Sequence, residues 1–309
     1  MKNNNVQKQI KKILFILSFL HLNFYCLFSQ NVGISSMQMF NISPGAKLSS
    51  LGGSGCAKFG EQESLWLNPA NSVGVKEKSF AITYSEMFAG IKYNYISFRY
   101  PYKNFYGIDI MYLYSEPISK TDILGNVYGE YNFSSILLSI TTSKKIKNVS
   151  TGFNLKFAQE SVEKFSSTAI GVLDIGFNYN FLNKECFFIG ICFQNIFGLS
   201  FNTTVSPVLR TGVSYVRKNV GYGSLNVLND FVYPLDGYIT NIFSVEYEFR
   251  NTIFFRCGYN YKFNSKIDYK LKGLNFGFGV QLKKCELNFC YIPYGDLGDV
   301  YKITFVLQI

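Results

Sequence analysis

Residues 173–181 read LDIGFNYNF, and this stretch indicates how the chain folds. Its odd-numbered positions are all large and apolar, whereas its even-numbered positions hold an aspartate, a glycine and two asparagines. A period of two is the pattern of a β-strand whose two faces meet different surroundings. The same period recurs in FSVEYEFR at 243–250 and LNFGFGVQL at 274–282, so the sequence predicts an all-β protein.

A soluble β-sandwich and a membrane barrel both fit a single strand of this kind. The whole chain favours the barrel, because 18% of its residues are aromatic and only 16% are charged, which is unusual for a soluble protein. Large aromatic side chains crowd the apolar face, and glycines and amides are frequent on the other face. Lipid outside the barrel and a wet, partly filled lumen inside it account for both faces.

Alternation and turn residues divide residues 79–309 into fourteen predicted strands. These are 79–88, 91–100, 105–114, 131–143, 150–158, 169–181, 186–196, 208–216, 221–228, 241–249, 252–261, 273–282, 286–291 and 300–309. The number is even, and most lengths are close to the roughly 9–11 residues that a tilted strand needs to cross a bilayer. We therefore predict a transmembrane antiparallel up-and-down β-barrel in the cell outer membrane, with outer-membrane lipid and the barrel-assembly machinery as partners.

The connections between the predicted strands alternate between short turns and long loops, of which 116–130 is the longest. Outer-membrane barrels have short periplasmic turns, so this division predicts that both ends of the chain are periplasmic. The short turns are basic, which predicts a docking rim for an acidic periplasmic partner, with solvated turn residues as the alternative. The candidate rim residues are Lys144, Lys145, Lys147, Lys283 and Lys284.

The first 30 residues have the layout of a secretory signal peptide. Four lysines precede an apolar run from Ile13 to about Phe28, and a small, polar pair follows it. The alternative is a retained transmembrane anchor, but His21 and Asn23 interrupt the run, which is short for a membrane span. The sequence therefore predicts export and removal of residues 1–30.

Removal of this segment takes away the single histidine of the chain, which excludes Ser-His-Asp and Cys-His catalytic arrangements. The six cysteines that remain contain no C-x-x-C pair, so their spacing indicates no zinc site. We expect them to be small apolar side chains on strands, with one disulfide as the alternative. The lysines form no stripe interleaved with aromatics of the kind that binds nucleic acid. The sequence predicts a protein that is not an enzyme, with no catalytic residue, cofactor, metal or nucleic-acid partner.

Two stretches resemble a known family. Residues 44–70, PGAKLSSLGGSGCAKFGEQESLWLNPA, resemble the start of PorV/PorQ family outer-membrane proteins, and YIPYGDLGDVYKI at 291–303 resembles the family's closing motif. Weaker similarities lie between them at 231–238, 256–261 and 273–280. The closing motif comprises Pro293, Gly295, Asp296, Leu297 and Gly298. The chain departs from the family at its last residue, an isoleucine where an aromatic is usual.

The resemblance implies a FadL-like barrel in which an N-terminal hatch, here residues 31–78, folds into the lumen. The hatch residues that it points to are Gly52, Gly53, Trp66, Asn68, Pro69 and Ala70. It also implies a part in type IX protein secretion, with exported proteins or secretion-system components as partners. The alternatives are a FadL-like transporter of small hydrophobic molecules and a structural barrel without cargo.

Overall fold

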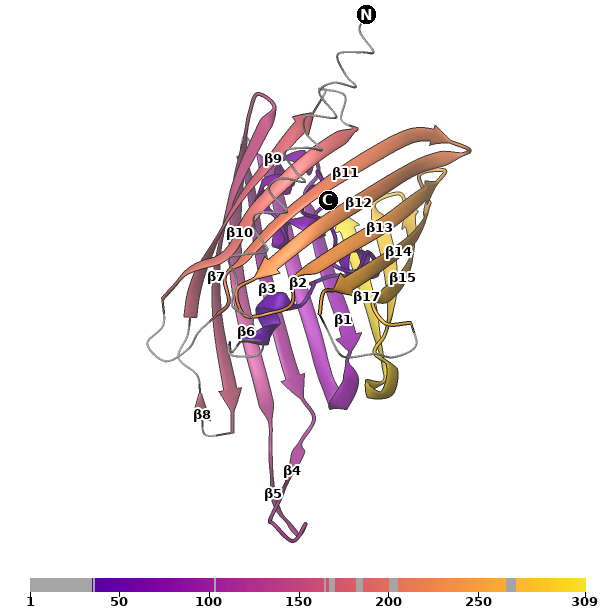
Figure 1. Ribbon diagram of the computed structural model, residues 1–309. Helices are drawn as coiled ribbons and strands as arrows, with labels where there is room; N and C mark the ends of the chain where they lie inside the picture. Colours follow the sequence, from indigo (N-terminus) through magenta and orange to yellow (C-terminus); the bar gives the residue numbers. More distant parts are fainter. Residues whose placement is uncertain are drawn as a thin grey trace, which may run out of the picture.

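The computed structural model describes residues 35, 37–102, 104–163, 165–166, 170–181, 186–199, 205–264 and 271–309. The predicted signal peptide lies outside these residues. Within them, fourteen antiparallel strands form the barrel (Figure 1). The barrel strands are β1 (Ser79–Glu86), β2 (Ile91–Tyr102), β3 (Asn104–Ser115), β6 (Phe133–Ile146), β7 (Val149–Val162), β9 (Ile170–Phe181), β10 (Phe187–Leu199), β11 (Val208–Val220), β12 (Gly223–Pro234), β13 (Thr240–Phe249), β14 (Ile253–Lys262), β15 (Leu274–Leu282), β16 (Cys285–Pro293) and β17 (Asp299–Gln308).

The barrel closes because its first and last strands pair with each other. β1 pairs with β17 in a continuous antiparallel register from Ser79 opposite Gln308 to Glu86 opposite Tyr301. Strand β6 pairs with both β3 and β7, so the ring of strands has no free edge there. Closure satisfies the backbone hydrogen bonds that an open sheet edge would leave unpaired in lipid. The predicted fold class and strand number are confirmed.

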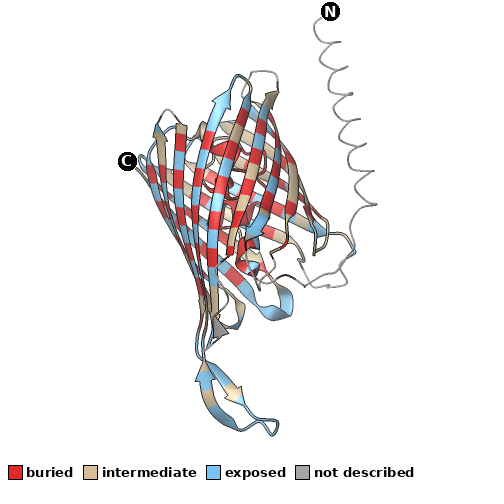
Figure 2. Cartoon of the chain, turned by 90° about the vertical axis from the view of Figure 1, so that its left-hand side faces the viewer, coloured by how far each residue is buried: buried red, intermediate tan, exposed pale blue. Residues whose placement is uncertain are grey.

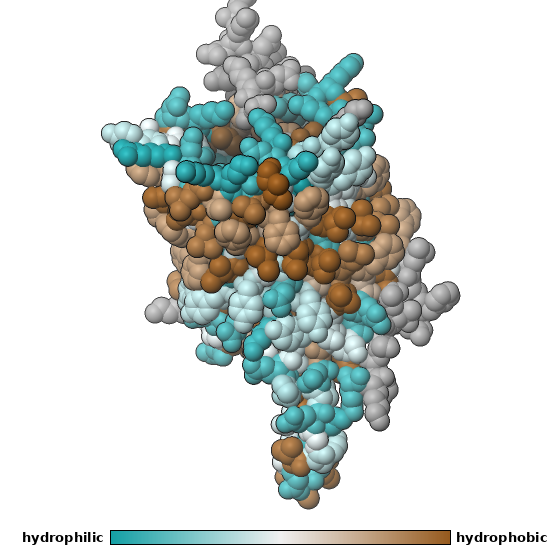
Figure 3. Space-filling model, turned by 180° about the vertical axis from the view of Figure 1, so that it is seen from behind, coloured by the Kyte–Doolittle hydropathy of each residue, from teal (hydrophilic) through white to brown (hydrophobic). Residues whose placement is uncertain are grey.

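Side chains alternate between lumen and exterior along the strands (Figure 2). In β1, Ala81 and Thr83 are buried inward, whereas Ile82 and Tyr84 are exposed outward. The outward side chains gather into an apolar belt around the middle of the barrel, with hydrophilic surface above and below it (Figure 3). A belt of this kind is the lipid-facing surface of an outer-membrane barrel. Among the described residues, no helix has the length and apolar character that crossing a membrane requires.

The barrel has one rim of short turns and one of longer connections. A hairpin of β4 (Ile118–Thr121) and β5 (Val127–Tyr131) projects from the long-loop rim (Figures 1 and 2), where the sequence predicted a loop without strands. A further short strand, β8 (Phe165–Ser166), pairs with the end of β7 on that side. The 3₁₀ turns η4 (Phe88–Gly90) and η5 (Gly295–Leu297) also belong to this rim.

The two ends of the described chain lie at opposite rims. The barrel begins and ends at the short-turn rim, where the Ile309 N–H donates to the Lys78 carbonyl at 2.8 Å. The Ser35 N–H instead donates to the Asp236 carboxylate at 3.1 Å, and Asp236 lies in a long loop. The expectation of both ends at the short-turn rim is therefore wrong for the N-terminal side, because the chain before β1 runs through the lumen.

Residues 37–75, which we name the inner segment, lie inside the barrel (Figure 1). Their short helical turns are η1 (Gln38–Asn41), α2 (Ala46–Ser50), η2 (Glu63–Trp66) and η3 (Pro69–Gly74). Leu48, Leu65 and Asn68 are completely buried there. The core of the protein is thus formed between the inner segment and the inward face of the strands.

Candidate functional site

Glycines on the inward face of the wall let the main chain of the inner segment lie directly against the strands. A side-chain carbon at Gly258 would come within 2.2 Å of the Leu51 carbonyl carbon, which leaves room for hydrogen only. Equally close approaches occur at four more wall positions: Gly152 against Pro69, Gly176 against Asn68, Gly190 against Cys56 and Gly277 against Ser50. The inward glycines of the alternating pattern therefore mark where the inner segment touches the barrel.

Asn68 fixes the second half of the inner segment to the wall. Its backbone is extended, with φ −155° and ψ 106°, as the proline that follows requires. Its side-chain amide donates to the Cys56 carbonyl at 2.8 Å and to the Phe177 carbonyl of β9 at 3.0 Å, and its oxygen accepts from the Ala70 N–H at 3.1 Å. The Asn-Pro-Ala sequence thus caps η3 and ties it to β9 in one arrangement.

Wall side chains also satisfy backbone groups in the first half of the inner segment. The Asp230 carboxylate accepts from the Gly55 and Cys56 N–H groups, each at 2.9 Å. The Asn275 amide donates to the Ser49 carbonyl at 2.7 Å. Irregular backbone at membrane depth needs such partners, because no lipid group can replace them.

A network of ion pairs joins the inner segment to the wall on the side of the short-turn rim. Lys58 pairs with Glu246 of β13 at 2.5 Å, and Arg256 of β14 pairs with the same carboxylate at 2.6 Å. Lys47 pairs with Glu286 of β16 at 3.0 Å. Two cations cover the Glu246 carboxylate and leave the residue 8% exposed. Breaking one partner of a buried pair costs several kcal/mol, so the network resists displacement of the inner segment.

Glu63 carries a buried carboxylate and belongs to the inner segment, not to a membrane-spanning strand. One of its oxygens accepts from the Leu48 N–H at 2.9 Å, and the residue is only 3% exposed. Burial, together with the charge of Glu61, raises its pKa to about 7. Near neutral pH this group therefore exchanges between a charged and a neutral form inside the inner segment.

Trp66 is held between the inner segment and the wall. The ammonium of Lys156 lies 4.3 Å from the centre of the indole ring, and it pairs with Asp174 at 2.7 Å. The Gln194 amide of β10 donates to the Trp66 carbonyl at 3.0 Å. Cation–π contact and a buried ion pair together fix the indole ring between the inner segment and the wall.

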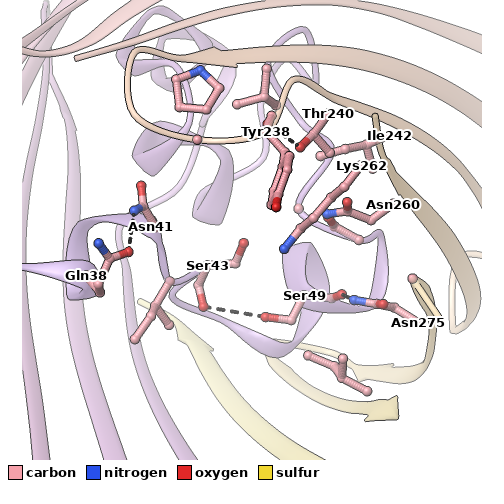
Figure 4. Close-up of a pocket in the computed structure, with 18 of the residues that line it drawn as sticks. Gln38, Asn41, Ser43, Ser49, Tyr238, Thr240, Ile242, Asn260, Lys262 and Asn275 are labelled. Atoms are coloured by element: carbon pink, nitrogen blue, oxygen red, sulfur yellow. Dashed lines mark hydrogen bonds between the residues drawn. The ribbon is translucent and has the colours of Figure 1, made fainter. Parts of the chain in front are cut away.

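A cavity of about 1040 Å³ lies between the inner segment and the long-loop rim (Figure 4). Its apolar lining consists of Phe40, Ile42, Trp66 and Leu67 of the inner segment with Val208, Val232, Ile242, Ile292 and Val300 of the wall and Phe88, Tyr238 and Leu297 of the rim. The cavity is large enough for a small organic ligand.

Polar groups of the cavity are mostly engaged by the protein itself. The Asn260 amide donates to the Gly52 carbonyl at 3.3 Å, and Lys302 donates to the Ser43 carbonyl at 2.6 Å. In Figure 4 the side chains of Tyr238 and Lys262 point into the open space. The interior thus offers apolar surface to a ligand, with polar groups at a few positions.

The two sequence motifs meet at this cavity. Gly52, Gly53 and Trp66 of the N-terminal motif line it together with Pro293, Asp296 and Leu297 of the C-terminal motif. Asn68, Pro69 and Ala70 are instead buried at the contact with the wall, and Gly295 and Gly298 shape the turn around η5 with positive φ values. Lys144, Lys145, Lys147, Lys283 and Lys284 lie exposed at the opposite, short-turn rim.

The wall residues of the cavity were not found from the sequence. Ile242, Asn260 and Asn275 occupy inward positions of ordinary alternating strands, and only the position of the inner segment distinguishes them from other inward residues. Within the described part of the chain, no cluster of His, Cys, Asp and Glu side chains is arranged to hold a metal ion. The six cysteines of that part, Cys56, Cys186, Cys192, Cys257, Cys285 and Cys290, are free thiols.

A scan against models of protein families and a search of curated proteins both gave no match. Solved structures do resemble this one. The toluene transporter TbuX of Ralstonia pickettii has a TM-score of 0.62 and 12% identity, over 87% of this chain and 100% of TbuX. The monoaromatic hydrocarbon channel CymD has a TM-score of 0.58 and 13% identity, over 86% and 98% of the two chains.

A third structure, a FadL homologue of Pseudomonas aeruginosa, has a TM-score of 0.52 and 8% identity, over 86% of this chain and 98% of the homologue. At such low identities the likeness concerns the fold alone. The inner segment, the closed barrel and these similarities together show that the chain has the FadL-like outer-membrane barrel fold.

Proposed function

We propose that this protein transports small hydrophobic molecules across the outer membrane and binds them in the cavity above the inner segment. The observation that carries the proposal is the cavity itself, about 1040 Å³ in volume and lined by Phe40, Trp66, Ile242 and other apolar side chains. Each ~100 Å² of apolar ligand surface that leaves water there contributes about 2.5 kcal/mol to binding. The titles of two similar structures, a toluene transporter and a monoaromatic hydrocarbon channel, agree with this ligand class.

In this proposal the inner segment is the plug of the transporter. Its ion pairs with Glu246 and Glu286 face the short-turn rim, whereas its apolar side chains face the cavity. A ligand from the long-loop side therefore meets an apolar floor and a closed exit. The plug holds the ligand and keeps water and ions from flowing through the lumen.

Type IX secretion, which the PorV/PorQ resemblance implies, is the rival role, and a structural barrel without cargo is another. The resemblance rests on two motifs, and no family model supports it. The apolar cavity and the titles of the similar structures favour transport over both rivals. The order of preference given by the sequence is therefore reversed in favour of transport.

A binding experiment tests the proposal, because Trp66 is the single tryptophan of the chain and lines the cavity. Titration of the detergent-purified protein with toluene is expected to change the fluorescence of Trp66 saturably. Ile242→Gln places an amide in the cavity wall and is expected to weaken binding about tenfold, which corresponds to about 1.4 kcal/mol.

The matched control is Ile146→Gln, because Ile146 is an exposed residue near the short-turn rim and far from the cavity. This variant is expected to bind as the wild type does. A fluorescence signal that does not saturate, or that Ile242→Gln leaves unchanged in a folded protein, would count against binding in the cavity.

A further inference from the structure

The short-turn rim carries exposed cations in widely separated turns. Lys145 lies in the β6–β7 hairpin, Arg217 beside the β11–β12 turn, Arg250 between β13 and β14, and Lys284 between β15 and β16. Lys78 precedes β1. Following the strand order of the barrel, these positions are spread around its circumference and do not form a one-sided patch.

Two of these cations lie on aromatic rings near the edge of the apolar belt. The Arg250 guanidinium lies 5.3 Å from the ring centres of both Tyr222 and Phe249. The Lys78 ammonium lies 4.8 Å from the ring centre of Tyr100. Aromatic residues mark the level of lipid headgroups, and basic side chains extend from that level toward water. In Figure 3 the hydrophilic side chains of this rim adjoin the apolar belt directly.

The opposite rim has a different charge. Exposed acids there include Glu86, Glu116 and Asp296. Cations such as Lys120 and Lys262 also lie at that rim, but acids accompany them, so among the described residues the excess of positive charge is at the short-turn rim. A partner that binds these cations therefore has to carry negative charge at the level of the short-turn rim and to surround the barrel.

We propose that the short-turn rim binds the phosphate groups of anionic phospholipids in the adjoining leaflet. Lipid surrounds a barrel on all sides, which fits cations in separated turns better than a protein partner that docks on one side. Each lysine or arginine near an anionic leaflet favours association, and the contributions add around the ring. The lipids would hold the barrel at a fixed depth, a role that is independent of what the cavity binds.

Native mass spectrometry of the purified protein with phosphatidylglycerol or phosphatidylcholine tests this proposal. The wild type is expected to retain phosphatidylglycerol about tenfold more strongly than phosphatidylcholine, because five or more cations contribute. Replacing Lys144, Lys145, Lys147, Lys283 and Lys284 with glutamine is expected to reduce this ratio to about twofold.

Two control variants separate charge from structure. Arginine at the same five positions keeps the charge and is expected to keep the preference for phosphatidylglycerol. Lys262→Gln with Lys272→Gln removes two cations from the other end of the barrel and is also expected to keep it. Heat-modifiable mobility on gels shows which variants are folded.

Two results would overturn the proposal. The first is a wild type that retains both lipids equally. The second is a folded glutamine variant that keeps the roughly tenfold preference of the wild type for phosphatidylglycerol. If the wild type shows no lipid preference but binds a polyglutamate peptide, and the glutamine variant does not bind it, the rim is a docking surface for an acidic protein instead.

Discussion

Deletion of residues 40–72 is expected to turn the closed barrel into an open pore, with a single-channel conductance in planar bilayers raised roughly tenfold. A fourteen-strand barrel leaves an aqueous lumen unless protein fills it. The deletion removes Lys47, Lys58 and Trp66, and it leaves the charged wall residues Glu246 and Arg256 facing water. Ions would then cross a wide polar channel.

The matched control is deletion of residues 118–131, which form the exposed β4–β5 hairpin. This hairpin projects away from the lumen, so its loss is expected to leave conductance unchanged (Figure 2). Both variants require heat-modifiable mobility as evidence of a folded barrel. A folded variant that lacks residues 40–72 and conducts no better than the wild type would contradict the plug.

Gly258→Leu is expected to have the second large effect, because the wall at this position touches the backbone of Leu51. A side-chain carbon 2.2 Å from a main-chain atom cannot be accommodated by a change of rotamer. Overpacking of this kind lowers the free energy of unfolding by about 1–3 kcal/mol. The midpoint of the heat-modifiable transition should fall, and conductance should rise because the inner segment no longer seals against β14.

Gly198→Leu in β10 is the corresponding control, since the nearest atom to a side-chain carbon there is 3.7 Å away. It is expected to shift neither the transition midpoint nor the conductance. If Gly258→Leu behaves like this control, the close packing between inner segment and wall does not determine the seal.

The barrel could be predicted from the sequence because its pattern is local. In LDIGFNYNF the polarity of each residue predicts which face of the strand it occupies. The structure places Asp174 and Asn178 inward and Phe177 and Tyr179 outward. The same alternation runs through the last strand, β17, from Asp299 to Gln308. These features depend only on residues that are close together in the sequence. A period of two describes their pattern fully.

What fills the lumen could not be predicted in the same way. Glu246 and Lys58 form an ion pair across 188 positions of sequence, and neither residue carries a local sign of the other. The sequence shows the inward glycines, but it does not show why glycine is needed there. The need arises from contact with Leu51 or Cys56, which depends on the path of the inner segment. The β4–β5 hairpin could not be predicted, because its strands are short and their residues are exposed or half-buried on both faces.

The measurement that tests the transport proposal most directly is uptake of radiolabelled toluene by cells whose outer membrane contains this protein and no related barrel. The proposal predicts an initial rate well above that of cells without the protein. Ile242→Gln, with its altered cavity, should return the rate close to that background, whereas Ile146→Gln should transport as the wild type does. Uptake at the background rate by cells with correctly folded wild-type protein in the outer membrane would contradict the proposal.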